Sequence, residues 1–262
     1  MQLTWLGTAS VLIEYGGLRL LTDPVLDANG GTYSFAPPPA PRSWFSSTRD
    51  YEVPLHEGEL GVIDGVLISH DHHADNLDTA GHRFVVAGTA APVVTNPHAA
   101  IRLSRVRDGV HGLRAGQSTE IGGVRITATP GRHGPLLTPR STQVCGFLLE
   151  SPGEPTVWIS GDTVLTPALR AWAAERAGID VAVVHAGGVH FAKAPVLGGA
   201  LFTMDAGQVV DLLTVLDPRV VIPIHRTGWS HFEPQHRLHE ALDRAGMLPR
   251  TRWLELGGET TV

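Results

Sequence analysis

One pattern recurs at five places along this chain of 262 residues: an apolar stretch of strand type, followed by a sharp turn that carries histidine or aspartate. In chain order the turns carry His70, His72, His73 and Asp75; then His133; then Asp162; then His185; then His225. Side chains at the ends of different strands can meet at one edge of a layered sheet. Such an edge can hold a metal ion and still leave coordination positions open for chemistry. The pattern therefore predicts a layered sheet domain with a metal site at one edge.

The first of these turns is the densest. The run SHDHHADNLD, residues 69–78, directly follows the apolar stretch Gly65–Ile68. Imidazole and carboxylate are the groups that hold zinc, iron or manganese. A lone histidine after a strand is more often structural, so the combination of the five turns carries the prediction.

The rest of the chain alternates short strands with helices. We expect strands over 3–6, 10–14, 18–22, 66–68, 84–86, 93–95, 124–129, 144–149, 157–159, 180–184 and 220–224. Capping residues and first-turn prolines predict helices over 166–177, 203–216 and 233–246. This order indicates an α/β layered domain, and since no composition break marks a linker, we expect one domain over 1–262.

Residues 27–60 interrupt this order as a loop insertion. The segment is rich in proline between 36 and 41 and carries Trp44, Phe45 and Tyr51. A stretch of this length is either a surface excursion or a lid over the site.

Composition narrows the partners. A net charge of −6 argues against nucleic acid, whose phosphates need a basic surface. No stretch reaches the about 18 uninterrupted apolar residues of a membrane span. The N-terminus has a strand pattern interrupted by Glu14, unlike a signal peptide, so we expect a cytoplasmic protein that acts on a small-molecule substrate. A homo-oligomer is compatible with the sequence.

Two further features concern chemistry. Cys145 is the single cysteine, so no intrachain disulfide can form, and its apolar neighbours predict a core position. The chain has no G-x-S-x-G nucleophile elbow, which disfavours a serine hydrolase.

The motifs carry a family resemblance. The pieces TWLGTASVLIEYGGLRLLTDPVLD, SHDHHADNLD, TPGRHG, ISGDT, DVAVVHAGG and VIPIHRTGW, within residues 4–229, resemble the metallo-β-lactamase-fold hydrolases. They are most similar to the branch of ascorbate-6-phosphate lactonases and N-acyl-phosphatidylethanolamine phospholipase D. The resemblance implies a four-layer αββα sandwich with one or two metal ions at an edge of the sheets.

It also implies residue roles. His70 would be the first histidine of the family's HxHxDH motif and Asp75 its aspartate. His133 would bind the first metal, His225 the second, and Asp162 would bridge both. The expected cofactor is zinc, as one or two ions, with manganese or iron as alternatives at the second site.

The implied reaction is hydrolysis of a lactone, ester, amide or phosphodiester bond by a metal-bound hydroxide, with Asp75 and Asp162 as the catalytic carboxylates. The alternative is a metal-binding protein of the same fold with altered or no hydrolytic activity.

The run also departs from the family motif. It has one residue too many, so the middle ligand is either His72 or His73, with a slight preference for His73. Asn76 stands where the motif has its last histidine, a ligand of the second metal. An amide oxygen is a weak ligand for zinc, so we expect a tight first site and a weaker second one, or one filled by a harder metal.

Three other residues are candidates for substrate binding. His185 lies in a glycine-rich turn, His231 lies in a loop beside Phe232, and Arg226 follows His225 and could bind an anionic group. The competing interpretations are structural hydrogen bonding for the histidines and a surface salt bridge for the arginine.

Overall fold

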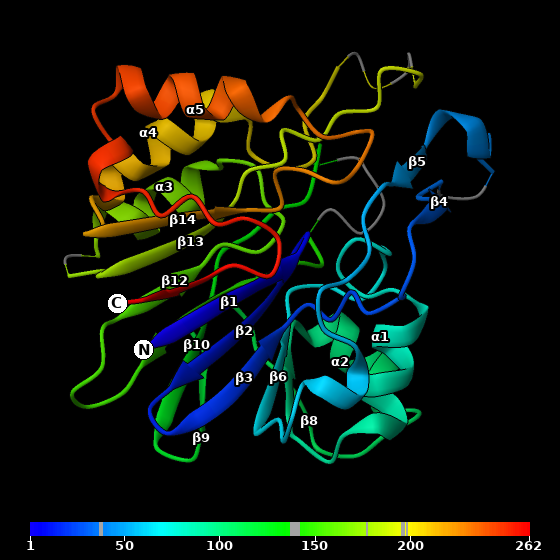
Figure 1. Cartoon of the computed structure of the whole chain (residues 1–262), viewed down its shortest axis with the longest axis vertical. Helices are drawn as coiled ribbons and strands as arrows, with labels where there is room; N and C mark the ends of the chain where they lie inside the picture. Colours follow the sequence, from blue (N-terminus) through cyan, green and yellow to red (C-terminus); the bar gives the residue numbers. More distant parts are fainter. Residues whose placement is uncertain (37–38, 137–141, 177, 195–196, 198) are drawn as a thin grey trace.

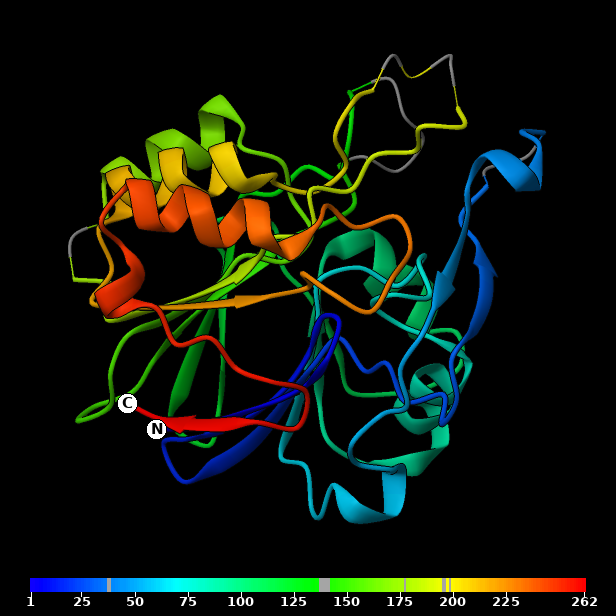
Figure 2. The same ribbon diagram turned by 45° about the horizontal axis from the view of Figure 1, so that its top comes forward.

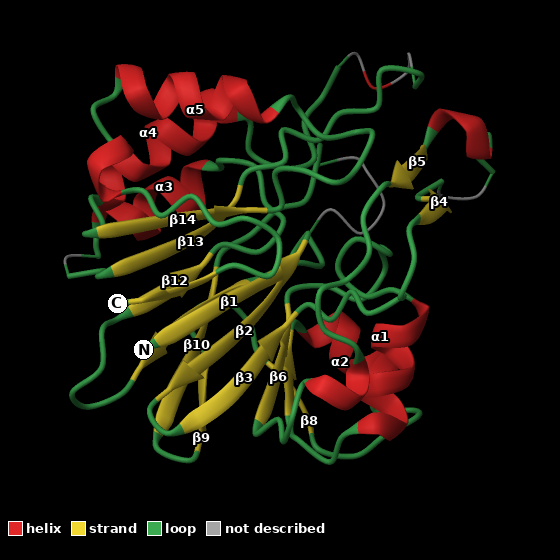
Figure 3. Ribbon diagram, viewed as in Figure 1, coloured by secondary structure: helices red, strands yellow, loops and turns green. Residues whose placement is uncertain are grey.

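Two mixed β-sheets face each other in this computed structural model, which describes all residues except 37–38, 137–141, 177, 195–196 and 198 (Figure 1, Figure 3). The first sheet has the order β15-β1-β2-β3-β6-β7-β8 and the second the order β14-β13-β12-β11-β10-β9. The first sheet contains β1 (Gln2–Gly7), β2 (Ser10–Tyr15), β3 (Leu18–Thr22), β6 (Gly65–Ile68), β7 (Val93–Thr95), β8 (Val110–Gly112) and β15 (Glu259–Thr261). The second contains β9 (Ser118–Ile121), β10 (Val124–Thr129), β11 (Gly146–Glu150), β12 (Val157–Ile159), β13 (Val181–His185) and β14 (Val220–Ile224).

Helices cover the outer face of each sheet. The helices α1 (Thr79–Arg83) and α2 (Pro97–Leu103) lie on the first sheet, and α3 (Pro167–Ala174), α4 (Ala206–Leu216) and α5 (Gln235–Arg244) lie on the second. Three apolar clusters separate these layers, one between the sheets and one under each helix layer. Alternation along β12 shows how the strands build them, because Ile159 faces the inter-sheet cluster and Trp158 faces the cluster under the helices. The layers are those of an αββα sandwich.

Several local predictions are confirmed. The strands and helices around the five turns have the expected type, with helix ends shifted by a few residues, and Cys145 is buried. The helix predicted to Ala177 ends at Ala174, and Ala177 lies outside the described residues.

The strand predicted over 84–86 is wrong. Residues Phe84–Gly88 form a π-helical turn that continues α1, and Phe84 and Val85 pack into the cluster under the first sheet. Burial of this pair therefore overrides the β-branched composition.

The insertion at 27–60 contains an unpredicted hairpin of β4 (Gly31–Ser34) and β5 (Ser46–Arg49). Figures 1 and 2 show it projecting beside the loops at one end of the sheets. The amide of Asp50 donates to the carbonyl of Gly228 at 3.1 Å, and Arg49 forms an isolated bridge with Trp229. The hairpin is thus attached to the loop that follows β14.

Buried polar contacts fix the base of the hairpin. The Arg49 guanidinium is fully buried, lies 3.5 Å from Asp78 Oδ2, and donates to the carbonyls of Asp27 and Asn29. Asp78 also accepts from the amides of Leu26 at 3.0 Å, Asp27 at 2.7 Å and Gly81 at 2.8 Å, the last as the N-cap of α1.

In the described part of the chain, no helix is both long and apolar enough to cross a membrane.

Candidate metal centre

The five turns meet at one edge of the two sheets, beside the insertion. Three residues there adopt the left-handed region: Thr8 with φ +45°, Asp23 with φ +35° and His225 with φ +53°. Such conformations are costly for residues other than glycine and cluster at functional sites. The bend at His225 is held by its own amide, which donates to the carbonyl of Thr8 at 2.9 Å. β14 is therefore docked on the turn between β1 and β2, at the point where His225 enters the site.

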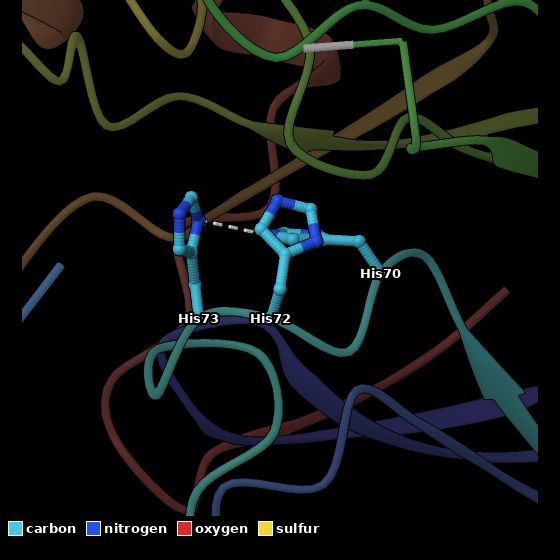
Figure 4. Close-up of side chains that lie close together, drawn as sticks. All are labelled: His70, His72 and His73. Carbon is cyan, nitrogen blue, oxygen red and sulfur yellow. Dashed lines mark hydrogen bonds between the residues drawn. The ribbon is translucent and has the colours of Figure 1, made fainter. Parts of the chain in front are cut away.

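A first group of possible ligands consists of His70, His73 and His133. His73 Nδ1 lies 3.2 Å from His70 Nε2 and 2.9 Å from His133 Nε2. Two nitrogens bound to one tetrahedral zinc ion at about 2.0 Å are separated by about 3.3 Å. Figure 4 shows His70 and His73 turned toward each other, both from the turn after β6. His72 lies beside them, with a ligand nitrogen within 4.8 Å of those of His70 and His73, and the nitrogen of His73 reaches that of His133 at 2.9 Å.

Asp162 belongs to two groups at once. Its carboxylate lies within 4.8 Å of the ligand atoms of His70 and His133, and also within 4.8 Å of those of Asp75 and His225. His225 Nε2 is 3.2 Å from Asp162 Oδ2 and 3.5 Å from Asp75 Oδ2. These three residues form the second group.

The two groups differ in charge. Burial, reinforced by neighbouring imidazoles, lowers the pKa values of His70 and His73 well below the ordinary range. Burial also lowers the pKa of His133. All three rings are therefore neutral at pH 7, the state in which imidazole binds a metal.

In the second group the carboxylates remain ionised. Burial alone would raise the pKa of Asp162, but the His225 and His185 imidazoles outweigh it and lower the pKa well below the ordinary range. Burial would likewise lower the pKa of His225, but the two carboxylates raise it to about 10. Without a metal, this group is two carboxylates around one imidazolium.

Unsatisfied polar atoms indicate that a cation fits here. Among the described residues, neither ring nitrogen of His225 makes a hydrogen bond, although Nε2 lies close to two carboxylates. Two buried carboxylates this close to one imidazole leave a surplus negative charge, and a shared cation would compensate that charge and bind the Nε2 atom of His225. The donor set of imidazoles and carboxylates suits zinc, iron or manganese.

Asn76 occupies the motif position of the missing histidine. Its side chain is fully buried, and with the amide nitrogen turned toward the site it donates to Asp75 Oδ1 at 3.3 Å and Asp162 Oδ2 at 3.0 Å. This orientation is assigned from the hydrogen-bond network. In it, Asn76 connects the two carboxylates.

Two candidate substrate residues lie elsewhere. His185 is fully buried beneath the site, and its Nδ1 is 2.8 Å from Asp162 Oδ1, so it orients that carboxylate and has no exposed face for a substrate. The Arg226 guanidinium lies between the rings of Trp5 and Trp253 and donates to the carbonyls of Pro223 and Leu254. Its side chain therefore leads away from the ligands, contrary to the expected role.

His231, the third candidate, does lie at the site. Its Nε2 is 3.5 Å from Asp75 Oδ2, and its Nδ1 contacts the hydroxyl of Ser47 on β5. Sequence reasoning missed Ser47, because only the fold of the insertion brings it there.

Several aromatic side chains cover the proposed ligands. Phe35, from the insertion, has its ring centroid 5.5 Å from that of His73 and 5.2 Å from that of His231. Phe202 meets His133 edge-on at 5.7 Å, and Phe191 stacks on His231 at 5.5 Å. The sequence pattern points to Trp44, Phe45 and Tyr51 in the insertion, whereas the aromatic residue that contacts the ligands is Phe35.

Comparisons with known proteins agree with this architecture. Residues 18–226 match the model of the beta-lactamase superfamily domain. A UPF0173 metal-dependent hydrolase of Nitratidesulfovibrio vulgaris is 29% identical over 238 residues, covering 88% of this chain and 81% of the relative. A UPF0173 protein of Pyrococcus furiosus is 25% identical over 238 residues, covering 90% and 88%.

Solved structures share the fold over the whole chain. A possible metal-dependent hydrolase from Veillonella parvula has a TM-score of 0.80 at 19% identity, covering 100% of this chain and 99% of that one. An isothiocyanate hydrolase from Delia radicum gut bacteria has a TM-score of 0.78 at 20% identity, with the same coverage. The predicted αββα metallo-β-lactamase fold is thereby confirmed, and the chain belongs to the beta-lactamase superfamily.

Proposed function

We propose that this protein is a metal-dependent hydrolase. The first ion would be held by His70, His73, His133 and Asp162, and the second by Asp75, Asp162 and His225. The observation that carries the proposal is the convergence of two ligand groups on one shared carboxylate, Asp162. Neutral histidines in one group and ionised carboxylates in the other support it.

We propose zinc for the first site and zinc, manganese or iron for the second. A divalent ion bound there supplies Lewis acidity and lowers the pKa of a coordinated water molecule. The chain's own residues supply orientation. His185 fixes Asp162 through a 2.8 Å contact, and Asp75 offers carboxylate oxygens that can orient a water molecule and accept its proton. Phe35, Phe191 and Phe202 exclude bulk water and can pack against an apolar part of the substrate.

The proposed substrate class follows from these phenylalanine side chains. Phe35, Phe191 and Phe202 line the site with apolar surface, while Arg49 and Arg226 are buried and donate to backbone carbonyls, so neither of these two is free to bind an anionic group. We therefore propose an electrophile with an apolar group, such as a lactone, ester or amide, ahead of a phosphodiester. The lactonase and phospholipase D branch and a cytoplasmic location remain predictions.

The test is a substrate panel on metal-loaded protein. Purified protein saturated with zinc, manganese or ferrous iron is assayed with lactone, ester, amide, phosphodiester and isothiocyanate substrates. We expect turnover with at least one class, and its loss in His133→Ala and Asp162→Ala. His111→Ala is the matched control, because His111 is exposed on β8, the edge strand of the first sheet. Silence across the panel at full metal loading would instead favour a metal-binding protein with altered chemistry.

A further inference from the structure

We propose that His231 is a ligand of the second ion and takes the place of the histidine that Asn76 has replaced. This inference rests on the proposed function, because it concerns the second of the two metal ions proposed for the same site. The second ion would then be held by Asp75, Asp162, His225 and His231, with Asn76 as a hydrogen-bond donor to the two carboxylates.

The position of Asn76 explains why another ligand is needed. In the orientation in which its amide nitrogen faces the site, Asn76 donates to Asp75 Oδ1 at 3.3 Å and to Asp162 Oδ2 at 3.0 Å. Without it, the second group offers only Asp75, Asp162 and His225. Asn76 is fully buried on the turn after β6, so a neutral donor there reduces the repulsion between two carboxylates.

His231 approaches the same carboxylate oxygen as His225. The Nε2 atom of His231 lies 3.5 Å from Asp75 Oδ2, and the Nε2 atom of His225 lies at the same distance from that oxygen. A nitrogen and an oxygen bound to one ion at about 2.1 Å are about 3.0 to 3.4 Å apart, depending on the coordination geometry. The observed spacing is therefore within a few tenths of an ångström of that expected for two ligands of one ion.

The hydrogen bond of the second ring nitrogen, Nδ1, determines that Nε2 of His231 is free to bind the ion. His231 Nδ1 contacts Ser47 Oγ, and Ser47 Oγ lies 3.1 Å from Ser230 Oγ. The Ser47 hydroxyl can accept from Nδ1–H and donate to Ser230, which leaves the lone pair on Nε2 directed at the site. Metal-bound histidines usually donate their second N–H to a neighbouring acceptor in this way.

Packing holds the ring in that orientation. Phe191 stacks on it with an interplanar angle of 13°, and Phe35 and Phe232 lie at 5.2 and 4.8 Å between centroids. The His231 side chain is only 5% exposed. So little free surface disfavours the substrate contact expected from the sequence and favours coordination of an ion inside the site.

The experiment measures metal content. Wild-type protein and His231→Ala are stripped with a chelator, reloaded with excess zinc, desalted and analysed by plasma mass spectrometry. We expect about two ions per chain in the wild type and about one in His231→Ala, by the ligand count argued above. His190→Ala is the control, because His190 is exposed on a neighbouring loop, and it should retain two ions. The double variant Asn76→His/His231→Ala should regain the second ion.

A second variant keeps the test decisive if His231→Ala does not fold. Ser47→Ala retains the imidazole but removes its acceptor, so the Kd of the second ion should rise about 10- to 100-fold while the first is unchanged. Titration followed by cobalt(II) absorption separates the two sites.

The outcomes distinguish the inference from the proposed function. Two ions in His231→Ala, with an unchanged second Kd in Ser47→Ala, overturns the inference. A wild type that holds one ion also overturns it, but leaves a one-metal hydrolase intact. Loss of the second ion in His231→Ala together with a silent substrate panel supports the inference and refutes hydrolysis.

Discussion

Replacing Asp78 by alanine should be among the most destabilising single changes outside the ligands. The side chain is fully buried, receives three backbone N–H groups, and faces the buried Arg49 guanidinium. Removing one partner of a buried ion pair costs about 3 to 5 kcal/mol, and losing a helix N-cap costs about 1 kcal/mol. Because neighbouring contributions are not additive, we expect a loss of at least about 4 kcal/mol in the free energy of unfolding.

The assay is urea denaturation of chelator-treated protein, which removes any contribution from bound metal. Asp205→Ala is the matched control, since Asp205 caps α4 through a single contact to the amide of Gln208 at 2.8 Å. It should cost about 1 kcal/mol. Equal losses in the two variants, or a loss below about 1 kcal/mol for Asp78→Ala, would refute the assignment of the Arg49–Asp78 pair as the anchor of the hairpin.

Three further outcomes follow from the site. His185→Ala should weaken the binding of both ions about 10- to 100-fold, because the His185 side chain orients Asp162, the carboxylate that both groups share. A chelator competition titration in which the affinity changes for only one ion would contradict this. The pKa of His225, raised to about 10, means that the metal-free protein carries a proton there at neutral pH. Binding of the second ion should therefore release one proton, and its affinity should rise about tenfold per pH unit between pH 6 and 8. Binding of the first ion should release no proton, because its histidines are already neutral. Calorimetry in buffers of different ionisation enthalpy measures the number of protons released. Phe35→Ala should leave the metal content unchanged and lower kcat/KM more for substrates with a large apolar group than for small ones; an equal loss for both would remove Phe35 from the substrate surface.

Much of the architecture could be predicted from local patterns. The strands that end at Ile68, Thr129, Ile159 and Ile224, and the turns that follow them, depend on residues that are close in sequence, so the sequence predicts them correctly. The hairpin of the insertion was missed, because the pairing of Gly31–Ser34 with Ser46–Arg49 depends on contacts across a proline-rich segment.

Side-chain direction was harder to predict than side-chain identity. His185 ends a strand flanked on both sides in the second sheet, and that position buries its ring beneath Asp162. The positive φ of His225 rotates the chain, so the next side chain, Arg226, leaves on the side of Trp5 and Trp253. Neither direction can be read from spacing alone, because each is set by strands distant in sequence.

The docking of His225 on Thr8 has a consequence for biosynthesis. The carbonyl of Thr8 accepts from His225 N and from Trp5 Nε1, and its hydroxyl accepts from Trp229 Nε1 at 2.8 Å. Because the chain is made from its N-terminus, the contacts of Thr8 with His225 and Trp229 can form only after β14 and the loop that follows it have been made, whereas the contact with Trp5 is local. Asp162 leaves the ribosome earlier, together with every proposed ligand of the first ion. All ligands of the first ion can therefore come together before His225 has been made, whereas the second site cannot be completed until β14 has docked on Thr8.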